Sequence, residues 1–445
     1  MKHELLGSVI AVVGLSDGDE GKGKITDYAA QQVDYVVRCQ GGANAGHTLV
    51  GFGEEVDLHQ IPAGICNEGV VNVIGNGFFL DPERLAAERA EVKKKTGLTV
   101  HQGNFVISHQ AHVVYPAHKE VDRAREGKKN DAQGSTQVGI AFVASDKALR
   151  EGIRAEDIQD ATRLELMEMA MERREVLAKR YGLSRGRAAV QAAFKEAKIF
   201  ANTAIDLQPF INDTVLLLHD RLEKGAKVLL EGAQAFGLDL DHGKYPFVTS
   251  SNPTVAGLLQ GSGINHQYVK DAIGVTKLVP SKVGGGVFIG QLPEAVAAKI
   301  RGKREDIDGE FGKTSGRPRD LGDLDLVKLA RAIMTNGITE LALTKSDWLR
   351  RRGDTTQIIV GYKVTDTQGN VTTVDIAPSG NKALLRCDPV YRTFDTWDNI
   401  RSIKAKKYFK FIEEQLGVPV TLIGTGTGRN DLVFRHQGKQ SAKRR

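Results

Sequence analysis

Four clusters of glycine directly follow apolar stretches of this chain, and they constrain its fold more than any other feature. The first apolar stretch, residues 8–15, reads SVIAVVGL and is rich in β-branched side chains, which is typical of a buried strand. The glycine clusters lie at 14–23, 41–46, 232–243 and 424–428. Because ligands of open parallel sheets bind at the carboxyl ends of the strands, these loops together predict one long cleft.

Strand-like and helix-like stretches alternate along the rest of the chain. Further strands are expected at 70–74, 104–108, 228–230, 271–275, 341–343, 357–363 and 418–423. Helices are expected at 23–32, 82–95, 325–335 and 400–416, and two or three more form a helical insertion at about 155–205 that is broken near Gly182. This alternation predicts an α/β fold with a large, mostly parallel central sheet flanked by helices, together with smaller subdomains. We expect a single domain over 1–435, followed by a basic tail at 436–445.

Composition excludes several classes of protein. Of the 445 residues 41% are hydrophobic, which argues against disorder, and no apolar stretch is long enough to span a membrane. The net charge of +6 is spread thinly, so no nucleic-acid partner is expected. The three cysteines, Cys39, Cys66 and Cys387, have no metal-site spacing and fit a reducing compartment, which predicts a cytoplasmic protein.

The first glycine cluster contains Gly18-Asp19-Glu20-Gly21-Lys22-Gly23-Lys24, which has the spacing of a phosphate-binding loop. Backbone N–H groups in such a loop, together with the start of a helix, favour phosphate. The next residue is Ile25, where a P-loop has the Ser or Thr that holds magnesium. A magnesium ligand must then come from elsewhere, and Asp19 is the obvious candidate. The alternative is an ordinary glycine turn with charged residues in solvent.

Two further segments carry side chains suited to catalysis and to base recognition. His47 directly follows the run of small residues at 41–46. Histidine is the usual general acid or base near neutral pH. The alternative is a loop histidine with satisfied hydrogen bonds. Thr344-Lys345-Ser346-Asp347 follows a predicted strand, and its carboxylate suits the two adjacent donors of guanine. The later strand end Gly424-Thr425-Gly426 could close over the base. A chance match remains the alternative for so short a motif.

Two more polar segments suit a purine nucleotide and a carboxylate. Gln234, in the run EGAQ at 231–234, offers an amide edge to a ring, and Thr249 and Ser250 suit a phosphate. The segment 312–319 places two arginines and two hydroxyls in a loop flanked by glycine, which matches carboxylate or phosphate. The alternatives are a polar loop and a flexible basic loop.

Six motifs follow one another along the chain: GDEGKGK, GGxNAGHT, EGAQ, DHGxYPFVTSSN, TSGRxR and TKxD. Together they resemble the adenylosuccinate synthetase family, over residues from about Val9 to Val433. The resemblance implies a P-loop-NTPase-like, GTP-binding ligase of purine biosynthesis that acts as a homodimer. Such an enzyme joins IMP and L-aspartate with GTP as co-substrate and Mg²⁺ as cofactor. The 6-oxygen of IMP is first phosphorylated, and the aspartate amine then displaces the phosphate.

The resemblance also implies roles for individual residues. Asp19 is the expected general base and magnesium ligand, and His47 the expected general acid. Lys22 is expected to stabilise the transferring phosphoryl group, and Gln234 to touch the purine. The positions implied for GTP are Gly18, Asp19, Glu20, Gly21, Lys22, Gly23, Lys24, Gly46, His47, Thr48, Arg319, Lys345, Ser346, Asp347, Gly424, Thr425 and Gly426, with the Gly46 carbonyl also on magnesium. The positions implied for IMP and aspartate are Asn44, Ala45, Thr136, Arg150 (supplied by the partner subunit), Gln234, Thr249, Lys313, Thr314, Ser315, Gly316, Arg317 and Arg319.

The chain departs from the family pattern at a number of positions, and several of these changes fall beside the expected amino-acid pocket. Family residues Gln-Trp are replaced by Ser16-Asp17, an arginine by Val138, a proline by Phe142, a tryptophan by Asp323 and a serine by Gly424, and the arginine run is thinned to Arg317-Pro318-Arg319-Asp320. These changes raise the hypothesis of a related ligase with a different amine donor or purine, such as dGMP, although the retained Asp19 favours IMP. A non-enzymatic alternative, a guanine-nucleotide switch module, gives no role to His47 or Gln234.

Overall fold

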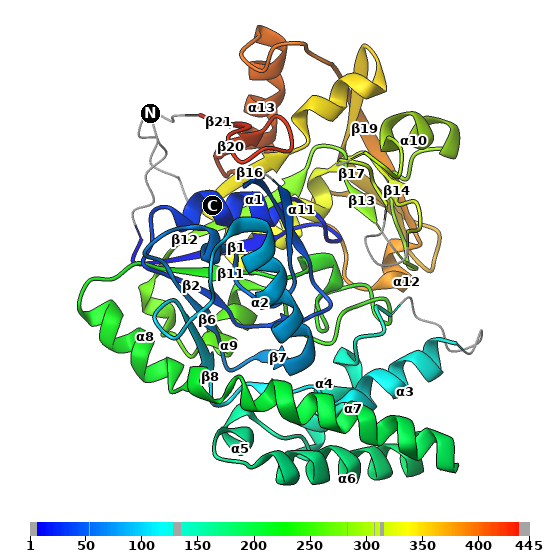
Figure 1. Ribbon diagram of the computed structural model, residues 1–445. Helices are drawn as coiled ribbons and strands as arrows, with labels where there is room; N and C mark the ends of the chain where they lie inside the picture. The colour runs from blue at the N-terminus through cyan, green and yellow to red at the C-terminus, as the bar shows by residue number, and fades with distance from the viewer. Residues whose placement is uncertain are drawn as a thin grey trace.

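The predicted central sheet is present and has ten strands. The computed structural model describes residues 7–52, 54–127, 135–282, 284–306, 308–311 and 316–435. From edge to edge the sheet contains β10 (Ile211–Asn212), β8 (Phe105–Ser108), β6 (Val71–Ile74), β2 (Tyr35–Arg38), β11 (Val228–Glu231), β1 (Val9–Gly14), β12 (Val269–Lys277), β16 (Glu340–Thr344), β20 (Val420–Gly424) and β21 (Leu432–Phe434). Every neighbouring pair is parallel except β20 and β21. The expected α/β class is confirmed, and Figure 1 shows the helices around this sheet.

The central strand β1 shows why an unbroken apolar run lies here. All six of its residues are buried. Because successive side chains of a strand point to opposite faces, Val9, Ala11 and Val13 enter one apolar core, and Ile10 and Val12 enter another. The first core includes side chains of α8 (Thr214–Glu223), α9 (Val255–Ser262), α11 (Leu326–Asn336) and α13 (Ile403–Leu416), and the second includes those of α1 (Lys22–Ala30).

Helix α2 (Pro82–Thr96) begins and ends where the sequence predicts. The Asp81 side chain accepts a hydrogen bond from the Arg84 N–H at 3.2 Å, which caps the first turn. Pro82 stands at the first helical position, where its missing N–H has no cost. Gly97 ends the helix in the left-handed conformation, with φ of 74°.

The stretch predicted as a helical insertion forms three helices, α5 (Ala155–Gln159), α6 (Arg163–Tyr181) and α7 (Arg187–Ile205). The predicted break is confirmed, because α6 ends at Gly182 with φ of 70°. Their apolar side chains join those of β8 and α2 in a third core, and Figure 1 shows α6 and α7 side by side near α3 (Pro116–Glu126) and α4 (Ile140–Leu149). None of the helices in the described part of the chain is long and apolar enough to cross a membrane.

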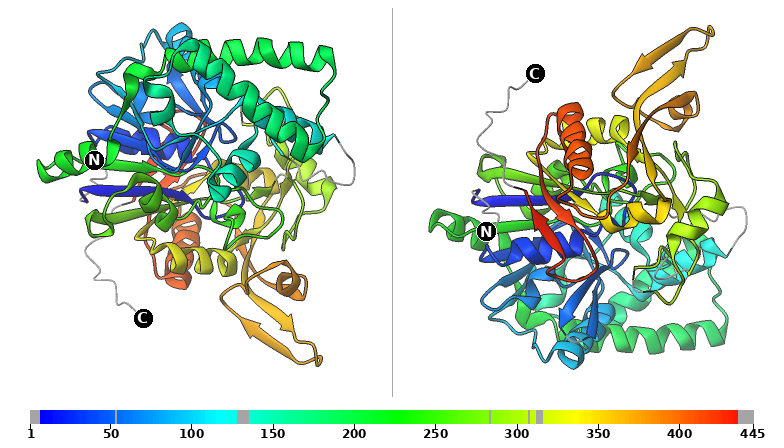
Figure 2. Two further views of the ribbon diagram at one scale, coloured as in Figure 1. Left: turned by 90° about the horizontal axis from the view of Figure 1, so that it is seen from below. Right: turned by 90° about the horizontal axis from the view of Figure 1, so that it is seen from above.

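Several smaller sheets surround the central one. The strand expected at 357–363 is present, but it belongs to a separate sheet of β15 (Leu324–Asp325), β17 (Thr355–Thr365), β18 (Val371–Val374) and β19 (Cys387–Asp395), and Figure 2 shows its hairpin projecting from the body. The other small sheets contain β3 (Gly41–Gly42), β7 (Phe78–Leu80) and β9 (His112–Val113); β4 (His47–Phe52) and β5 (Glu54–Leu58); and β13 (Ser281–Lys282) and β14 (Asp320–Leu321). Two short helices, α10 (Glu294–Arg301) and α12 (Asn381–Leu384), complete this part.

Candidate active site

The glycine clusters follow strands of one parallel sheet, as predicted, and three of them follow the adjacent strands β2, β11 and β1. They approach one another closely. A Cβ atom added at Gly14 would lie 2.6 Å from Glu20 Oε2 and 2.8 Å from the Gln234 carbonyl oxygen. One added at Gly424 would lie 3.3 Å from Lys24 Nζ. The first loop therefore touches both the third and the fourth, which joins the predicted segments into one site.

The loop after β1 is organised by the buried carboxylate of Glu20. This carboxylate accepts hydrogen bonds from the N–H groups of Ser16 at 3.2 Å and Gly18 at 2.9 Å, and from Lys22 Nζ at 2.7 Å. Gly18, Asp19 and Gly21 all have positive φ, of 101°, 56° and 81°. A non-glycine residue in the left-handed region is held there only when its surroundings demand it. The loop is therefore a specific structure ahead of α1 and not an arbitrary glycine turn.

Asp19 projects from this loop and is paired with Arg319. Its side chain is 48% exposed, and Arg319 Nη2 lies 2.7 Å from its carboxylate. Arg319 is buried and also contacts Glu310 at 2.8 Å. Glu310 in turn accepts from Lys277 Nζ at 2.7 Å. Asp19, the expected base, is therefore the solvent-exposed end of a series of alternating charges whose other members, Arg319, Glu310 and Lys277, are buried.

His47 forms a buried pair with Glu231, a residue for which the sequence predicts no role. His47 Nδ1 lies 2.5 Å from Glu231 Oε1, and Glu231 Oε2 accepts from the Ala63 N–H at 2.8 Å. Burial lowers the pKa of His47, and the Glu231 carboxylate does not offset this. Burial alone would raise the pKa of Glu231, but His47 and Arg38 lower it. The ring therefore has a fixed orientation beside an ionised carboxylate.

The close approach of α1 to His47 requires a glycine. A Cβ atom added at Gly23 would lie 3.0 Å from the His47 Cβ, and Lys22 is near enough to lower the pKa of His47. The loop that carries Asp19 and the turn that carries His47 are therefore neighbours, as the sequence predicts.

Gln234 has a buried side-chain amide whose hydrogen-bonding groups are unsatisfied. It has a φ of 55°, and both polar atoms of its side-chain amide are buried without a hydrogen-bond partner. A Cβ atom added at Gly41 would lie 3.0 Å from its Oε1. Buried amides without partners are rare because each costs about 1–3 kcal/mol. A bound group with a donor and an acceptor edge would satisfy this amide.

The predicted guanine site also has an unsatisfied carboxylate. Asp347 Oδ1 is buried without a partner, and burial raises the pKa of this carboxyl group. Lys345 Nζ lies 3.9 Å from the centroid of the Trp348 ring and donates to the Asp308 carbonyl oxygen at 2.9 Å. Ser346 Oγ donates to the Gly424 carbonyl oxygen at 2.8 Å, so the two strand ends expected to enclose a base are in contact.

Some of the remaining predicted residues have contacts among the site loops, and others lie outside the described residues. Asn44 Nδ2 donates to Thr249 Oγ1 at 3.3 Å, and Lys24 Nζ donates to the Gly426 carbonyl oxygen at 2.8 Å. Thr48 Oγ1 donates to Asp57 at 2.5 Å. The structure also describes Ala45, Gly46, Thr136, Gly316, Arg317 and Thr425, whereas Lys313, Thr314, Ser315 and the tail at 436–445 lie outside the described residues.

The structure shows the surroundings of two of the sequence departures. Val138 packs beside a small apolar cluster around Phe79 and Ile140, where an arginine would have no partner among the cluster's side chains. Asp323 is buried and forms an ion pair with Arg352 at 2.6 Å.

The described residues contain no group of three or more His, Cys, Asp or Glu side chains able to hold a metal ion by themselves.

Comparison with known proteins agrees with this geometry. The family model described as adenylosuccinate synthetase matches residues 11–433. Adenylosuccinate synthetases of Caldicellulosiruptor saccharolyticus and Caldicellulosiruptor bescii are 39% and 40% identical to the chain; the alignments cover 97% and 96% of this chain and 100% and 99% of the relatives.

Two solved structures are also similar. The structure of fully ligated adenylosuccinate synthetase from Plasmodium falciparum matches 97% of this chain and 100% of its own, with a TM-score of 0.87 and 32% identity. A cyanophage S-2L succinoaminodeoxyadenylate synthetase bound to dGMP and dATP is 18% identical with a TM-score of 0.58, over 97% of this chain and 96% of its own, and shares the fold alone. On this evidence the chain belongs to the adenylosuccinate synthetase family.

Proposed function

We propose that Asp19, Lys22, His47 and Gln234 carry out the reaction of this family. As a member of it, the chain is a GTP-dependent ligase that joins IMP and L-aspartate to give adenylosuccinate, GDP and phosphate. The observation that carries the residue assignment is the meeting of three loops, bearing Asp19, His47 and Gln234, at the ends of the adjacent strands β1, β2 and β11.

The chemistry needs a base and an acid on either side of one ring. The 6-oxygen of IMP becomes a nucleophile only when the N1 proton leaves, and the half-exposed Asp19 carboxylate is available to accept that proton. His47 donates its Nδ1–H to Glu231. Its Nε2 is then available to the phosphoryl group that passes from GTP to IMP. When Nε2 takes up a proton, the Glu231 carboxylate stabilises the imidazolium. Lys22 adds positive charge where the phosphoryl group passes.

We propose that GTP lies along 18–24, with its base at Lys345, Asp347 and Gly424. Mg²⁺ would be held by the Asp19 carboxylate and the Gly46 carbonyl together with phosphate oxygens, because magnesium is usually bound by one or two carboxylates plus substrate phosphates. One half-exposed carboxylate fits that arrangement. The ion would neutralise charge on the phosphates. Arg319 must then leave Asp19 or share it.

We also propose a homodimer in the cytoplasm, in which Arg150 reaches the IMP phosphate of the partner subunit. Arg150 is exposed at the end of α4 in the left-handed conformation, with φ of 61°, and its neighbour Leu149 is 50% exposed. All three cysteines are free, which suits a reducing compartment.

The substrate assignment is tested by measuring phosphate release with IMP, GMP and dGMP against L-aspartate and other amines. We expect turnover with IMP, GTP and L-aspartate, and turnover restricted to dGMP or to another amine would reject that assignment. Asp19→Asn should abolish turnover, while Asp366→Asn, in an exposed turn of the β17–β18 hairpin, should not. Turnover by Asp19→Asn would reject its role as the base.

The dimer is tested by mixing two defective variants. In a hybrid of Asp19→Asn and Arg150→Ala, one site receives both defects and the other receives neither. Equal mixing should therefore restore about one quarter of wild-type turnover at low IMP, because half of the dimers are hybrids with one intact site. No recovery would place Arg150 in its own subunit's site, and wild-type turnover by Arg150→Ala alone would place it outside the site.

A further inference from the structure

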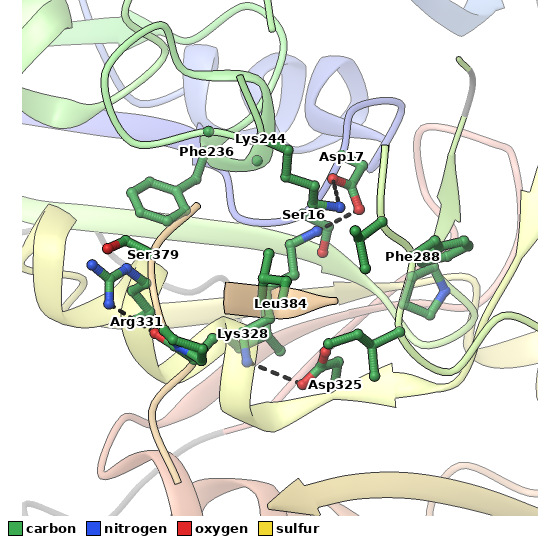
Figure 3. Close-up of a pocket in the computed structure, with 18 of the residues that line it drawn as sticks. Ser16, Asp17, Phe236, Lys244, Phe288, Asp325, Lys328, Arg331, Ser379 and Leu384 are labelled. Atoms are coloured by element: carbon green, nitrogen blue, oxygen red, sulfur yellow. Dashed lines mark hydrogen bonds and ion pairs between the residues drawn. The ribbon is translucent and has the colours of Figure 1, made fainter. Parts of the chain in front are cut away.

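Two lysine side chains converge on a buried carboxylate directly before the catalytic loop. Asp17 is buried, and its Oδ1 lies 2.9 Å from Lys244 Nζ while Oδ2 pairs with Lys328 Nζ. Figure 3 shows both contacts at the wall of a cavity. The three residues come from different parts of the chain: the loop after β1, the loop after β11 and helix α11.

The backbone around Asp17 is held as tightly as its side chain. The Gly237 N–H donates to the Ser16 carbonyl oxygen at 2.8 Å, and Ser16 Oγ lies 2.9 Å from Thr276 Oγ1. A Cβ atom added at Gly237 would lie 2.4 Å from the Ser16 carbonyl oxygen and 2.5 Å from Asp17 Oδ1. The two loops therefore fit together only with glycine at this position.

Each end of this contact leads to a residue of the proposed machinery. Asp17 lies two residues before Asp19. Lys244 belongs to the loop that contains Thr249, whose N–H donates to the Leu238 carbonyl oxygen at 2.8 Å and whose hydroxyl accepts from Asn44. The Asp17 carboxylate thus connects the loop of the proposed base to the loop of the proposed nucleotide-phosphate contact.

A cavity adjoins this contact, and Ser16 and Asp17 belong to its lining. This cavity has about 760 Å³ of empty space, its open mouth included, and Phe236, Phe288 and Leu384 are among its lining residues. Burial would raise the pKa of Asp17, but the charges of Lys328 and Lys244 hold it well below its usual range. The two ammonium groups therefore compensate for the burial of the Asp17 carboxylate.

We propose that Asp17 is a positioning residue that sets the register between the Asp19 loop and the Thr249 loop through Lys244 and Lys328. The proposal rests on the proposed function, because it assumes the roles given to Asp19 and Thr249. The proposal accounts for the replacement of the family's tryptophan by Asp17 through the positioning of two loops. This explanation does not require a change of substrate.

The test compares Asp17→Asn with Asp323→Asn. Both substitutions remove a buried carboxylate that lines the same cavity, and both leave a cation behind, Lys244 and Lys328 in one case and Arg352 in the other. Only Asp17 adjoins the catalytic loop. We expect Asp17→Asn to lower kcat about tenfold to hundredfold and also to raise KM for GTP, since the loop that it positions is proposed to bind the GTP phosphates. Asp323→Asn should keep kcat within about twofold of wild type.

A double variant separates positioning from fold support. Asp17→Asn/Lys244→Met removes one of the two ammonium groups that Asp17→Asn leaves unpaired, so it should recover part of the thermal stability but not kcat. Full recovery of kcat in the double variant, or wild-type kcat in Asp17→Asn, would overturn the proposal. If Asp17→Asn does not fold, the double variant alone decides. Asp19→Asn, assayed in parallel, reports on the proposed function separately, because its activity would reject the base whatever Asp17→Asn does.

Discussion

Two buried histidine–carboxylate pairs in this molecule look alike and differ in one respect. In the candidate active site His47 Nδ1 lies 2.5 Å from Glu231, and between α3 and α4 His118 Nε2 lies 2.7 Å from Asp146. An arginine accompanies each pair: Arg38 in the first and Arg173 in the second. Burial lowers the pKa of both histidines. Composition and burial alone would therefore assign the two pairs the same role.

The difference lies in how far each hydrogen-bond network is completed. His118 Nδ1 accepts from the Tyr115 N–H at 3.0 Å, and Arg173 Nε donates to Asp146 at 2.7 Å, so this network is closed. By contrast, all three Arg38 guanidinium nitrogens are buried without a hydrogen bond, the nearest lying 3.9 Å from Glu231. A closed network supports the fold, whereas an open one has capacity left for a substrate.

The largest effect expected from this comparison follows His47→Asn. The asparagine amide can occupy the place of Nδ1 and keep the hydrogen bond to Glu231, but it cannot donate a proton from the place of Nε2. Turnover with IMP, GTP and L-aspartate should fall by about 10²–10⁴-fold, the usual contribution of general acid–base catalysis. Steady-state phosphate release measures this, with thermal unfolding as the control. Wild-type kcat in a folded variant would contradict the role of His47.

Glu231→Gln should have the next largest effect. The amide keeps the shape of the side chain but cannot stabilise an imidazolium, so kcat should fall about tenfold to hundredfold. The pKa of His47 should fall further, which moves the pH optimum to lower pH. A pH–rate profile of the variant measures both changes. Lower stability with an unchanged profile would show that Glu231 only supports the fold.

The sequence predicts the loops of the site better than the contacts between them. Glycine clusters after apolar strands, and caps such as Asp81 and Gly97, are local signals, and the structure confirms the elements that they predict. Pairing is not local. Glu231 lies 184 residues from His47, and Asp17 lies 227 residues from Lys244, so neither contact has a nearby signature.

The same reason explains the smaller sheet. The strand at 357–363 was predictable because it contains the short apolar run Ile358-Ile359-Val360, but its antiparallel partner β19 is exposed or half-buried along its length and carries no comparable run. The roles of Lys313, Thr314 and Ser315 stay predictions, because these residues lie outside the described part of the chain.

His118→Gln should affect stability and spare activity, the opposite of His47→Asn. Removing the ring leaves Asp146 and the Tyr115 N–H with incomplete partners, which costs about 1–3 kcal/mol of unfolding free energy. Urea unfolding measures the loss, and kcat should stay within about twofold of wild type. A large fall in kcat without loss of stability would mean that the closed pair also serves the reaction.

The smallest effect is a pH dependence that distinguishes a neutral His118 from a charged one. Burial lowers the pKa of His118 below its ordinary 6.5, although Asp146 acts in the opposite direction. Below pH 6.5 the unfolded chain therefore binds a proton that the folded chain does not, so stability falls as the pH falls through this value, by up to about 1.4 kcal/mol per pH unit for one group.

His118→Gln removes this titrating group, so the variant should lose less stability than wild type between pH 7 and pH 5, and the difference between the two proteins should shrink by about 1 kcal/mol. Urea unfolding of both proteins at several pH values measures the difference. A difference that stays constant would contradict the lowered pKa of His118, and one that grows as the pH falls would mean that His118 is protonated in the fold. Asp146 would then hold an imidazolium at rest, as Glu231 is proposed to do only during the reaction, and the two pairs would differ in charge as well as in completeness.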